Sequence, residues 1–417
     1  MNGMRRREFL SLSALAAGGA FLTSSVAFGD VSARNSRFVL VILRGALDGL
    51  AAVPPYADPD YARLRGEAAL RAPGDAGGVL PLNGFFGLHP SLSFLEECYQ
   101  ERELIVFHAL ATGYRERSHF DGQDVLENGS LKPHALQSGW LNRALTQLPG
   151  PAARVPGVAL GQNVPLVMRG PAEVSSWSPS KMSGLDEDTL ARITDLYAGD
   201  QLLATRLADA LAADAMMAER EPGTAKPEGA TAAGAPAGVA QAQAAKARYA
   251  QTVAAAAAFL RQAQGPRVAV FDTAGWDTHV NEGAAEGQLA GRLKALDQGL
   301  ASLKQQLGSA WADTAVLLVT EFGRTAAING ARGTDHGTGA AALLLGGAVT
   351  GGRVIADWPG LSARALYQGR DLTPTLDLRS VFKGILAEHL GVPPRALEDS
   401  VFPESASARV LRGLTRA

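Results

Sequence analysis

The chain has little of several features that would identify its class at once. Its 417 residues include a single cysteine, Cys98, which excludes an internal disulfide and a cysteine-rich zinc site. The 39 Lys and Arg residues nearly balance the 41 Asp and Glu residues, so no basic surface indicates nucleic acid as a partner. With 47% hydrophobic residues, the chain is apolar enough for one large domain or two ordinary ones, and it is not a disordered chain.

The first 29 residues have the pattern of an export signal. Arg6-Arg7 stands in a basic start, a short hydrophobic stretch from Leu12 to Leu22 follows, and Ala27-Phe28-Gly29 offers a small-residue cleavage site. This stretch is shorter than the roughly 20 residues that span a bilayer, and no later segment is long and apolar enough. We therefore expect a twin-arginine signal peptide and a periplasmic or secreted protein, with an uncleaved N-terminal anchor as the alternative.

Several catalytic motifs are absent. The sequence has no phosphate-binding loop that ends in Gly-Lys-Ser/Thr, no Gly-x-Ser-x-Gly elbow and no His-Glu-x-x-His pair. These absences argue against a nucleotide hydrolase, an ordinary esterase and a common zinc protease. The export route often carries redox proteins, but no dinucleotide fingerprint or haem motif supports an oxidoreductase.

Short continuous hydrophobic runs predict strands that are buried on both faces. The runs of strand length are Phe38–Leu43, Leu104–Ala109, Val268–Phe271, Ala315–Thr320 and Ala341–Leu345. Helices are expected at Pro90–Gln100, Gln288–Gly308 and Arg379–Leu390. The alternation of strands and helices predicts an α/β fold with a mostly parallel central sheet flanked by helices.

The middle of the chain has a different composition. Asp186–Glu219 and Gln241–Gln264 have the Ala- and Leu-rich pattern of long helices, and Arg220–Ala240 is rich in Pro, Gly and Ala without a hydrophobic period. We interpret residues 186–264 as a helical hairpin inserted into a single domain that spans residues 30–417. In this interpretation residues 220–240 are a flexible loop, and a separate helical domain is the alternative.

Polar segments lie at or near the ends of the predicted strands. Because parallel sheets bind ligands outside the carboxyl ends of their strands, we expect these side chains to meet at one edge. Carboxylates and imidazoles are ligands of zinc or manganese, and one or two divalent ions would need such a set. The candidate metal ligands are Asp48, His119, Asp121, Asp277, His279, Asp335 and His336.

A serine and an arginine complete the candidate site. Ser118 could be a nucleophile activated by nearby cations, and Arg324 could hold two oxygens of a tetrahedral ester. Each residue also has a structural alternative. Ser118 could be the N-cap of a helix, Arg324 the partner of Glu321, Asp48 a turn or cap residue, and Asp277-x-His279 a hydrogen-bonded pair.

Other histidines and aspartates carry less weight. His108 ends a hydrophobic strand and is expected in the core, and His389 lies in a Leu-rich helical pattern. Asp371 and Asp377 could support the site from outside the ligand set, although capping of the last helix explains Asp377 equally well.

The motifs in this order resemble an exported bacterial family known as domain of unknown function 1501, whose members resemble the alkaline phosphatase and sulfatase superfamily in fold. The resemblance covers nearly the whole chain after the signal. It rests on LRGALDGL (43–50), GLHPSL (87–92), RSHFDGQD (117–124), GWLNRAL (139–145), FDTAGWDTH (271–279), TEFGRT (320–325), GTDHGTG (333–339), DWPGL (357–361) and GRDLTPTLDLRSV (369–381).

The resemblance implies site residues one by one. It matches the first-strand aspartate of the superfamily to Asp48, the hydroxyl nucleophile to Ser118, and metal ligands to Asp277, His279, Asp335 and His336. The spacing Asp-x-His departs from the Asp-x-x-x-His of superfamily phosphatases, and the sulfatase signature Cys/Ser-x-Pro-x-Arg is absent around Cys98 and Ser118. A formylglycine sulfatase is therefore not expected.

These observations predict an exported, metal-dependent hydrolase of phosphate or sulfate esters with a serine nucleophile. Its partner would be a small anionic ester or a component of the cell envelope. The alternative is a non-catalytic envelope binding or assembly protein on the same fold.

Overall fold

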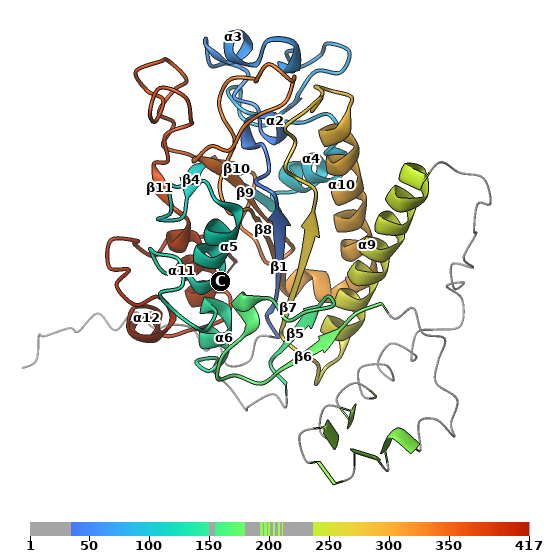
Figure 1. The fold of residues 1–417 in the computed structure, drawn as a ribbon. Helices are drawn as coiled ribbons and strands as arrows, with labels where there is room; N and C mark the ends of the chain where they lie inside the picture. Colours follow the sequence, from blue (N-terminus) through green and yellow to red (C-terminus); the bar gives the residue numbers. More distant parts are fainter. Residues whose placement is uncertain are drawn as a thin grey trace, which may run out of the picture. The chain divides into compact units, whose positions relative to one another are not determined.

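Figure 1 shows the computed structural model, which describes residues 35–149, 155–179 and 237–416 together with scattered positions between 192 and 211. The expected signal peptide of residues 1–29 lies outside the described residues. So do most of the expected helix Asp186–Glu219 and residues 220–236 of the expected loop. Ala237–Ala240, the last four residues of that loop, instead begin helix α9.

The central sheet has nine strands in the order β10-β4-β9-β8-β1-β7-β5-β6, and β11 also pairs with β4. All five strands that the hydrophobic runs predict are present, so the α/β fold class is confirmed. The strands of this sheet are β1 (Arg37–Arg44), β4 (Leu104–Ala111), β5 (Gly157–Leu160), β6 (Val174–Trp177), β7 (Val268–Ala274), β8 (Thr314–Val319), β9 (Ala340–Leu345), β10 (Arg353–Ile355) and β11 (Leu376–Asp377). A separate pair, β2 (Leu80–Pro81) and β3 (Gly87–Leu88), is antiparallel.

The sheet is mostly parallel, as predicted, with one exception that matters for the site. Strands β8, β1, β7, β5 and β6 run parallel to one another. Strand β9 lies between β8 and β4 and is antiparallel to both. The first residues of β9 therefore lie at the edge where the parallel strands end.

Helices cover both faces of the sheet (Figure 1). Alternate residues of β1 serve the two faces: Val39 and Val41 belong to the hydrophobic core that contains α4, α9 and α10, and Phe38 and Leu40 belong to the core that contains α6 and α11. The helices are α2 (Gly49–Ala52), α3 (Tyr61–Arg65), α4 (Ser93–Gln100), α5 (His119–Asn128), α6 (Trp140–Leu145), α9 (Ala237–Arg261), α10 (Gln288–Leu307), α11 (Leu378–Glu388) and α12 (Pro394–Ala396).

Helix α10 follows its sequence pattern closely. The leucines from Leu289 to Leu307 recur at steps of four and three, and all of them are buried on one face of the helix.

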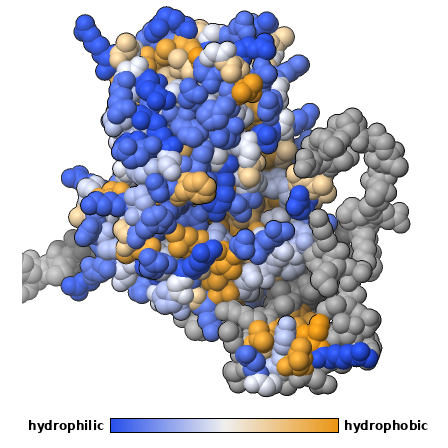
Figure 2. Space-filling view, in the orientation of Figure 1, coloured by the Kyte–Doolittle hydropathy of each residue, from blue (hydrophilic) through white to orange (hydrophobic). Residues whose placement is uncertain are grey.

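Among the described residues, no helix is long and apolar enough to cross a membrane. Figure 2 shows a mixed surface in which hydrophobic residues are interspersed among hydrophilic ones.

A buried histidine stands where the β4–β9 pairing shifts register, between Phe107 and Leu110. Both ring nitrogens of His108 are used: Nε2 donates to the carbonyl of Val53 at 3.0 Å, and Nδ1 accepts from the amide of Ala109 at 2.9 Å. This pattern fits only the neutral ring. Burial lowers the pKa of His108 to about 4, so the expectation of a core histidine is confirmed.

His108 should make the stability of the protein depend on pH below neutrality. Between the unfolded pKa of about 6.5 and the folded pKa, the unfolded chain binds a proton that the folded protein does not. The free energy of unfolding is therefore highest above this pH range and decreases as the pH falls through it. We expect the free energy of unfolding to drop by about 3 kcal/mol more in the native protein than in His108→Gln over this range. Denaturant unfolding at a series of pH values measures this difference. Equal pH slopes in the two proteins would contradict it, and His134→Gln, at an exposed histidine, is the control.

Candidate metal centre

The loops at one edge of the sheet bring the predicted site residues together. His119 is the first residue of α5, which follows β4, and Asp277 and His279 follow β7. Arg324 follows β8, whereas Asp335-His336 precedes β9. Asp335-His336 thus lies before a strand, whereas the other motifs follow one. This motif reaches the same edge because β9 is antiparallel and begins there.

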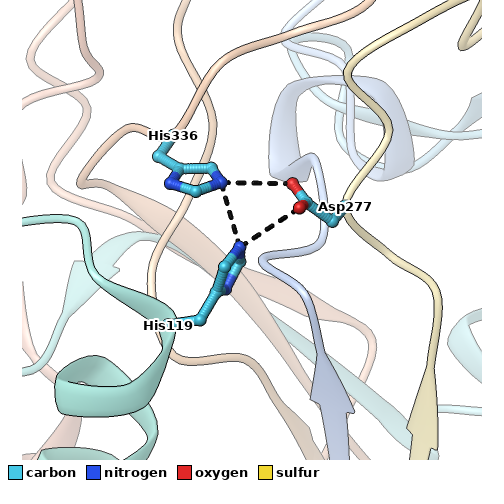
Figure 3. Close-up of side chains that lie close together, drawn as sticks. All are labelled: His119, Asp277 and His336. Atoms are coloured by element: carbon cyan, nitrogen blue, oxygen red, sulfur yellow. Dashed lines mark hydrogen bonds and ion pairs between the residues drawn. The ribbon is translucent and has the colours of Figure 1, made fainter.

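Three side chains converge within one ion's reach (Figure 3). The Nε2 atoms of His119 and His336 are 2.9 Å apart, and the carboxylate of Asp277 lies 3.3 Å from the first and 3.2 Å from the second. Ligands of a tetrahedral zinc ion, each at about 2.0–2.1 Å, lie about 3.3 Å from one another. The observed spacing is close to that of a coordination sphere.

His279 is a fourth candidate donor. Its Nε2 lies 2.9 Å from Asp277 Oδ1 and 3.0 Å from Nε2 of His336. Its Nδ1 lies 3.3 Å from Oδ1 of Asp335. Asp335 also accepts a hydrogen bond from Asn329 at 3.0 Å, so its carboxylate supports His279 from outside the ligand set. The sequence places Asp335 among the ligands, whereas its contacts give it this supporting position.

The far nitrogen of each histidine faces an oxygen that accepts hydrogen bonds. Nδ1 of His119 lies 2.8 Å from Oε1 of Glu321, and Nδ1 of His336 lies 2.9 Å from the carbonyl oxygen of Arg117. Each Nδ1 is thus placed to carry a ring hydrogen, and when both rings are neutral each Nε2 directs a lone pair toward the other Nε2. Two lone pairs 2.9 Å apart beside a carboxylate repel one another unless a cation lies between them. The donor set therefore fits a divalent metal ion.

The electrostatics of the cluster agree with this geometry. Burial would raise the pKa of Asp277, but its hydrogen bond with Arg324 and the charge of Arg324 hold that pKa below its usual value. Burial and the charge of His119 lower the pKa of His336, which favours the neutral ring. The hydrogen bond to Glu321 raises the pKa of His119, so this point of the site attracts positive charge.

Glu321 is a supporting residue that the sequence offers only as a partner of Arg324. Its buried carboxylate accepts hydrogen bonds from the amide of Gly45 at 2.9 Å and from Gln123 at 3.0 Å, in addition to His119. The hydrogen bonds from His119 and Gln123 overcome the effect of burial and lower the pKa of Glu321. Phe322 stacks on the His119 ring at 5.0 Å and shields it from water. The position of Glu321 directly after the predicted strand 315–320 is the signal that could have identified it.

Arg324 holds Asp277 in place. Its side chain is fully buried, and its guanidinium donates to Asp277 Oδ1, to the Thr334 hydroxyl and to the Thr334 carbonyl. These contacts involve all three of its nitrogens. The structure therefore gives Arg324 a positioning role, and its guanidinium is not free to grip an ester as the sequence suggests.

Two glycines allow the loops to approach one another. A Cβ on Gly333 would lie 2.3 Å from the carbonyl carbon of His279, and a Cβ on Gly337 would lie 2.3 Å from the carbonyl oxygen of Arg324. Both neighbours are backbone atoms and cannot rotate away. Glycine at these positions is therefore required for Asp335-His336 to reach the histidine and aspartate loop.

Asp48 caps a helix, which is the structural role that the sequence offers as the alternative to metal binding. Its Oδ1 caps α2 by accepting from the amides of Leu50 and Ala51 at 2.9 and 3.1 Å, and its Oδ2 pairs with Arg65. Both side chains are buried, and Arg65 also lies 3.8 Å from Glu282. Within the described residues, no contact joins Asp48 to the histidine cluster. Its carboxylate is used by the cap and the ion pair instead of by a metal.

Ser118 and Asp121 lie beside the cluster without joining it. Ser118 occupies the N-cap position of α5, but its side chain makes no capping hydrogen bond, and its amide donates to the hydroxyl of Tyr114 at 3.2 Å. Asp121 accepts from the same hydroxyl at 3.3 Å and lies 3.6 Å from His134. Among the described contacts, none links either side chain to His119, Asp277 or His336, so the nucleophilic role of Ser118 stays a prediction.

The remaining candidates have structural partners. His389 is buried, and its Nε2 donates to the carbonyl of Arg37 at 2.8 Å, so it is not a metal ligand. Asp377 caps α11 by accepting from the amide of Arg379. Cys98 is a buried free thiol. Asp371 pairs with Arg117 beside the cluster.

A cavity of about 690 Å³ adjoins α5. Arg44 and Arg169 line it together with Gln123, Asp124 and Phe120, whose side chain is 89% exposed. The size is within the range of ligand-binding pockets, about 300–1,000 Å³. Its lining is mostly polar, so it fits a polar group better than a hydrocarbon.

Comparisons with known proteins identify the family. No curated protein sequence matches the chain. Among solved structures the chain is similar to the "Crystal structure of Ps i-CgsB in complex with k-i-k-neocarrahexaose", with a TM-score of 0.39, 10% sequence identity, and coverage of 90% of this chain and 77% of that chain. The family described as "Protein of unknown function (DUF1501)" matches residues 110–401, and this protein belongs to it.

Proposed function

We propose that this protein is a metal-dependent hydrolase of phosphate or sulfate esters that acts at the His119, Asp277 and His336 cluster. One observation carries the proposal. The imidazole Nε2 atoms and the Asp277 carboxylate converge with their lone pairs, while the ring hydrogens are held on the far side by Glu321 and by the Arg117 carbonyl. Such a cluster is stable when a cation lies at its centre.

The residues have distinct roles in this proposal. His119, His336 and Asp277 hold the ion, and His279 is the fourth donor. Glu321 orients His119, and Arg324 orients Asp277. A divalent ion would polarise an ester oxygen and make a bound water more acidic.

Ser118 is the candidate nucleophile because it directly precedes a ligand. The residue before it, Arg117, has a positive φ of 61°, which is uncommon for a residue with a side chain and is found at functional sites. This backbone conformation turns the chain so that the carbonyl of Arg117 reaches His336 while Ser118 begins α5.

Metal analysis combined with ester hydrolysis tests the proposal. The purified protein should contain zinc or manganese and should hydrolyse aryl phosphates or aryl sulfates. Chelation and Ser118→Ala should both lower that turnover, whereas metal content should survive Ser118→Ala. A metal-free protein that cannot be loaded, or a metal-loaded protein inactive on both ester classes, would contradict the proposal.

A non-catalytic metal-stabilised binding protein is the second candidate. Three donors converge at the centre, and His279 lies beside two of them as a candidate fourth. Structural zinc sites are closed by four protein ligands, whereas catalytic sites keep an open position. In that case the ion would raise the stability of the protein without turnover. A thermal shift on metal loading together with inactivity toward esters would favour this function.

We also propose export by the twin-arginine route, which places the reaction or the binding partner in the periplasm or outside the cell. Arg6-Arg7 followed by Phe9-Leu10 supports it. Fractionation of cells that express the native sequence and an Arg6→Lys, Arg7→Lys variant tests it. The native protein should appear outside the cytoplasm and the variant should remain inside, and equal distributions would contradict the proposal.

A further inference from the structure

Hydrolysis of an anionic ester requires positive groups that recognise its oxygens, and Arg324 is not available for this role. All three guanidinium nitrogens of Arg324 are engaged, and its side chain is fully buried. Recognition must therefore come from other cations at the mouth of the centre. This inference rests on the proposed function and names the residues that would bind the anionic group.

Two arginines flank the centre on the side of His336. Arg117 donates its Nε to Asp371 Oδ2 at 2.8 Å and its Nη2 to Gln368 at 2.7 Å. Arg370 lies 3.0 Å from Asp371 Oδ1 through its Nε and donates its Nη2 to the carbonyl of His336 at 2.7 Å. The carboxylate of Asp371 thus lies between the two guanidinium groups.

Both arginines are hydrogen-bonded to His336, Arg117 through its backbone carbonyl and Arg370 through its guanidinium. The carbonyl of Arg117 accepts the Nδ1 hydrogen of His336, and Arg370 donates to the carbonyl of that same histidine. The guanidinium of Arg370 and the backbone of Arg117 are therefore fixed relative to a metal ligand, and Asp371 and Gln368 hold the guanidinium of Arg117. Such fixed geometry is what binding of a substrate next to an ion requires.

Asp371 is the carboxylate that pairs directly with both arginines, and the charge of Arg370 also acts on Asp335. Asp371 is fully buried and offers one negative charge to two guanidinium groups. The side chains of Arg117 and Arg370 are 18% and 43% exposed, so solutes can reach them. Among the described residues, none accepts a hydrogen bond from Nη1 of either arginine, which leaves donors for an anion.

We propose that Arg117 and Arg370 form the recognition site for a tetrahedral oxyanion, the phosphate or sulfate group of the substrate. A guanidinium matches two oxygens of such a group, and its hydrogen bonds to an anion are stronger than neutral ones. Asp371 is the positioning residue, because its carboxylate lies between the two guanidinium groups and holds them in place. The ester group would bridge these arginines and the metal centre, with Ser118 next to both.

Binding of inorganic phosphate and inorganic sulfate, measured by calorimetry, tests this assignment. Arg370→Gln removes the more exposed guanidinium and should weaken binding of the preferred anion at least about tenfold, with metal affinity unchanged. Arg370→Lys should recover only part of the loss, because an ammonium group cannot offer the two-pronged contact. Arg395→Gln, at an exposed arginine on α12, is the matched control and should leave binding unchanged.

The outcomes separate this inference from the proposed function. Equal anion binding by the native protein and Arg370→Gln, or an equal loss in Arg395→Gln, would overturn the assignment even if the protein hydrolyses esters. Failure of the native protein to bind either anion would overturn it as well. Selective loss in Arg370→Gln would support it even if the metal-loaded protein proves inactive.

Discussion

Replacing His336 with alanine is expected to abolish stoichiometric binding of zinc or manganese. Nε2 of His336 contacts each of the other three donors, at 2.9 Å from His119, 3.0 Å from His279 and 3.2 Å from Asp277. Its removal leaves a gap in the middle of the set. Loss of a residue that only orients a ligand typically lowers metal affinity by about 10–100-fold, so loss of a central ligand should cost more.

Competition with a chelator of known affinity measures this effect, and two further variants calibrate it. Glu321→Gln keeps the size of a residue that orients His119, and it should fall within the range of about 10–100-fold. His134→Ala is the matched control, since His134 is exposed and contacts Asp121 and Asp124 instead of the cluster. Native metal content in His336→Ala, or loss of metal in His134→Ala, would contradict the assignment of the centre.

The strands could be predicted because a strand that is buried on both faces has a continuous run of hydrophobic residues in the sequence. The core of β1, Phe38–Leu43, is an uninterrupted hydrophobic run, and so is β8. The direction of a strand has no such pattern, and the antiparallel course of β9 could not be read from Ala341–Leu345. Strand β6 was missed because it is short and half-exposed, with two serines among its four residues.

The site could be predicted in part for a similar reason. Polar residues after buried strands must lie at the sheet edge, which identified Asp277, His279 and the segment of His119. The functions of individual carboxylates could not be separated, because each depends on a partner far away in the sequence. Glu321 serves His119, which lies 202 positions before it, and Asp277 is held by Arg324, 47 positions after it.

Asp48 is another carboxylate whose function depends on its partner, which is Arg65. Asp48→Ala should lower the free energy of unfolding by about 3–5 kcal/mol, because it leaves the fully buried guanidinium of Arg65 without its ion pair. The charge of Arg65 holds the pKa of Asp48 below its usual value despite burial. In the native protein, burial and the charge of Asp48 together raise the pKa of Glu282 to about 8, so near neutrality Asp48 is the ionised partner of Arg65.

Two readouts decide whether Asp48 supports the fold or binds a metal. Denaturant unfolding should show the large loss of stability in Asp48→Ala. Asp48→Asn should be about 1 kcal/mol more stable than Asp48→Ala, since asparagine can still cap α2. Both variants should bind as much metal as the native protein under conditions where they are folded. If instead Asp48→Asn loses metal while its stability is unchanged, Asp48 is a ligand and the ion pair with Arg65 is secondary. The first result is expected because the Asp48 carboxylate already has three partners, the amides of Leu50 and Ala51 and the guanidinium of Arg65.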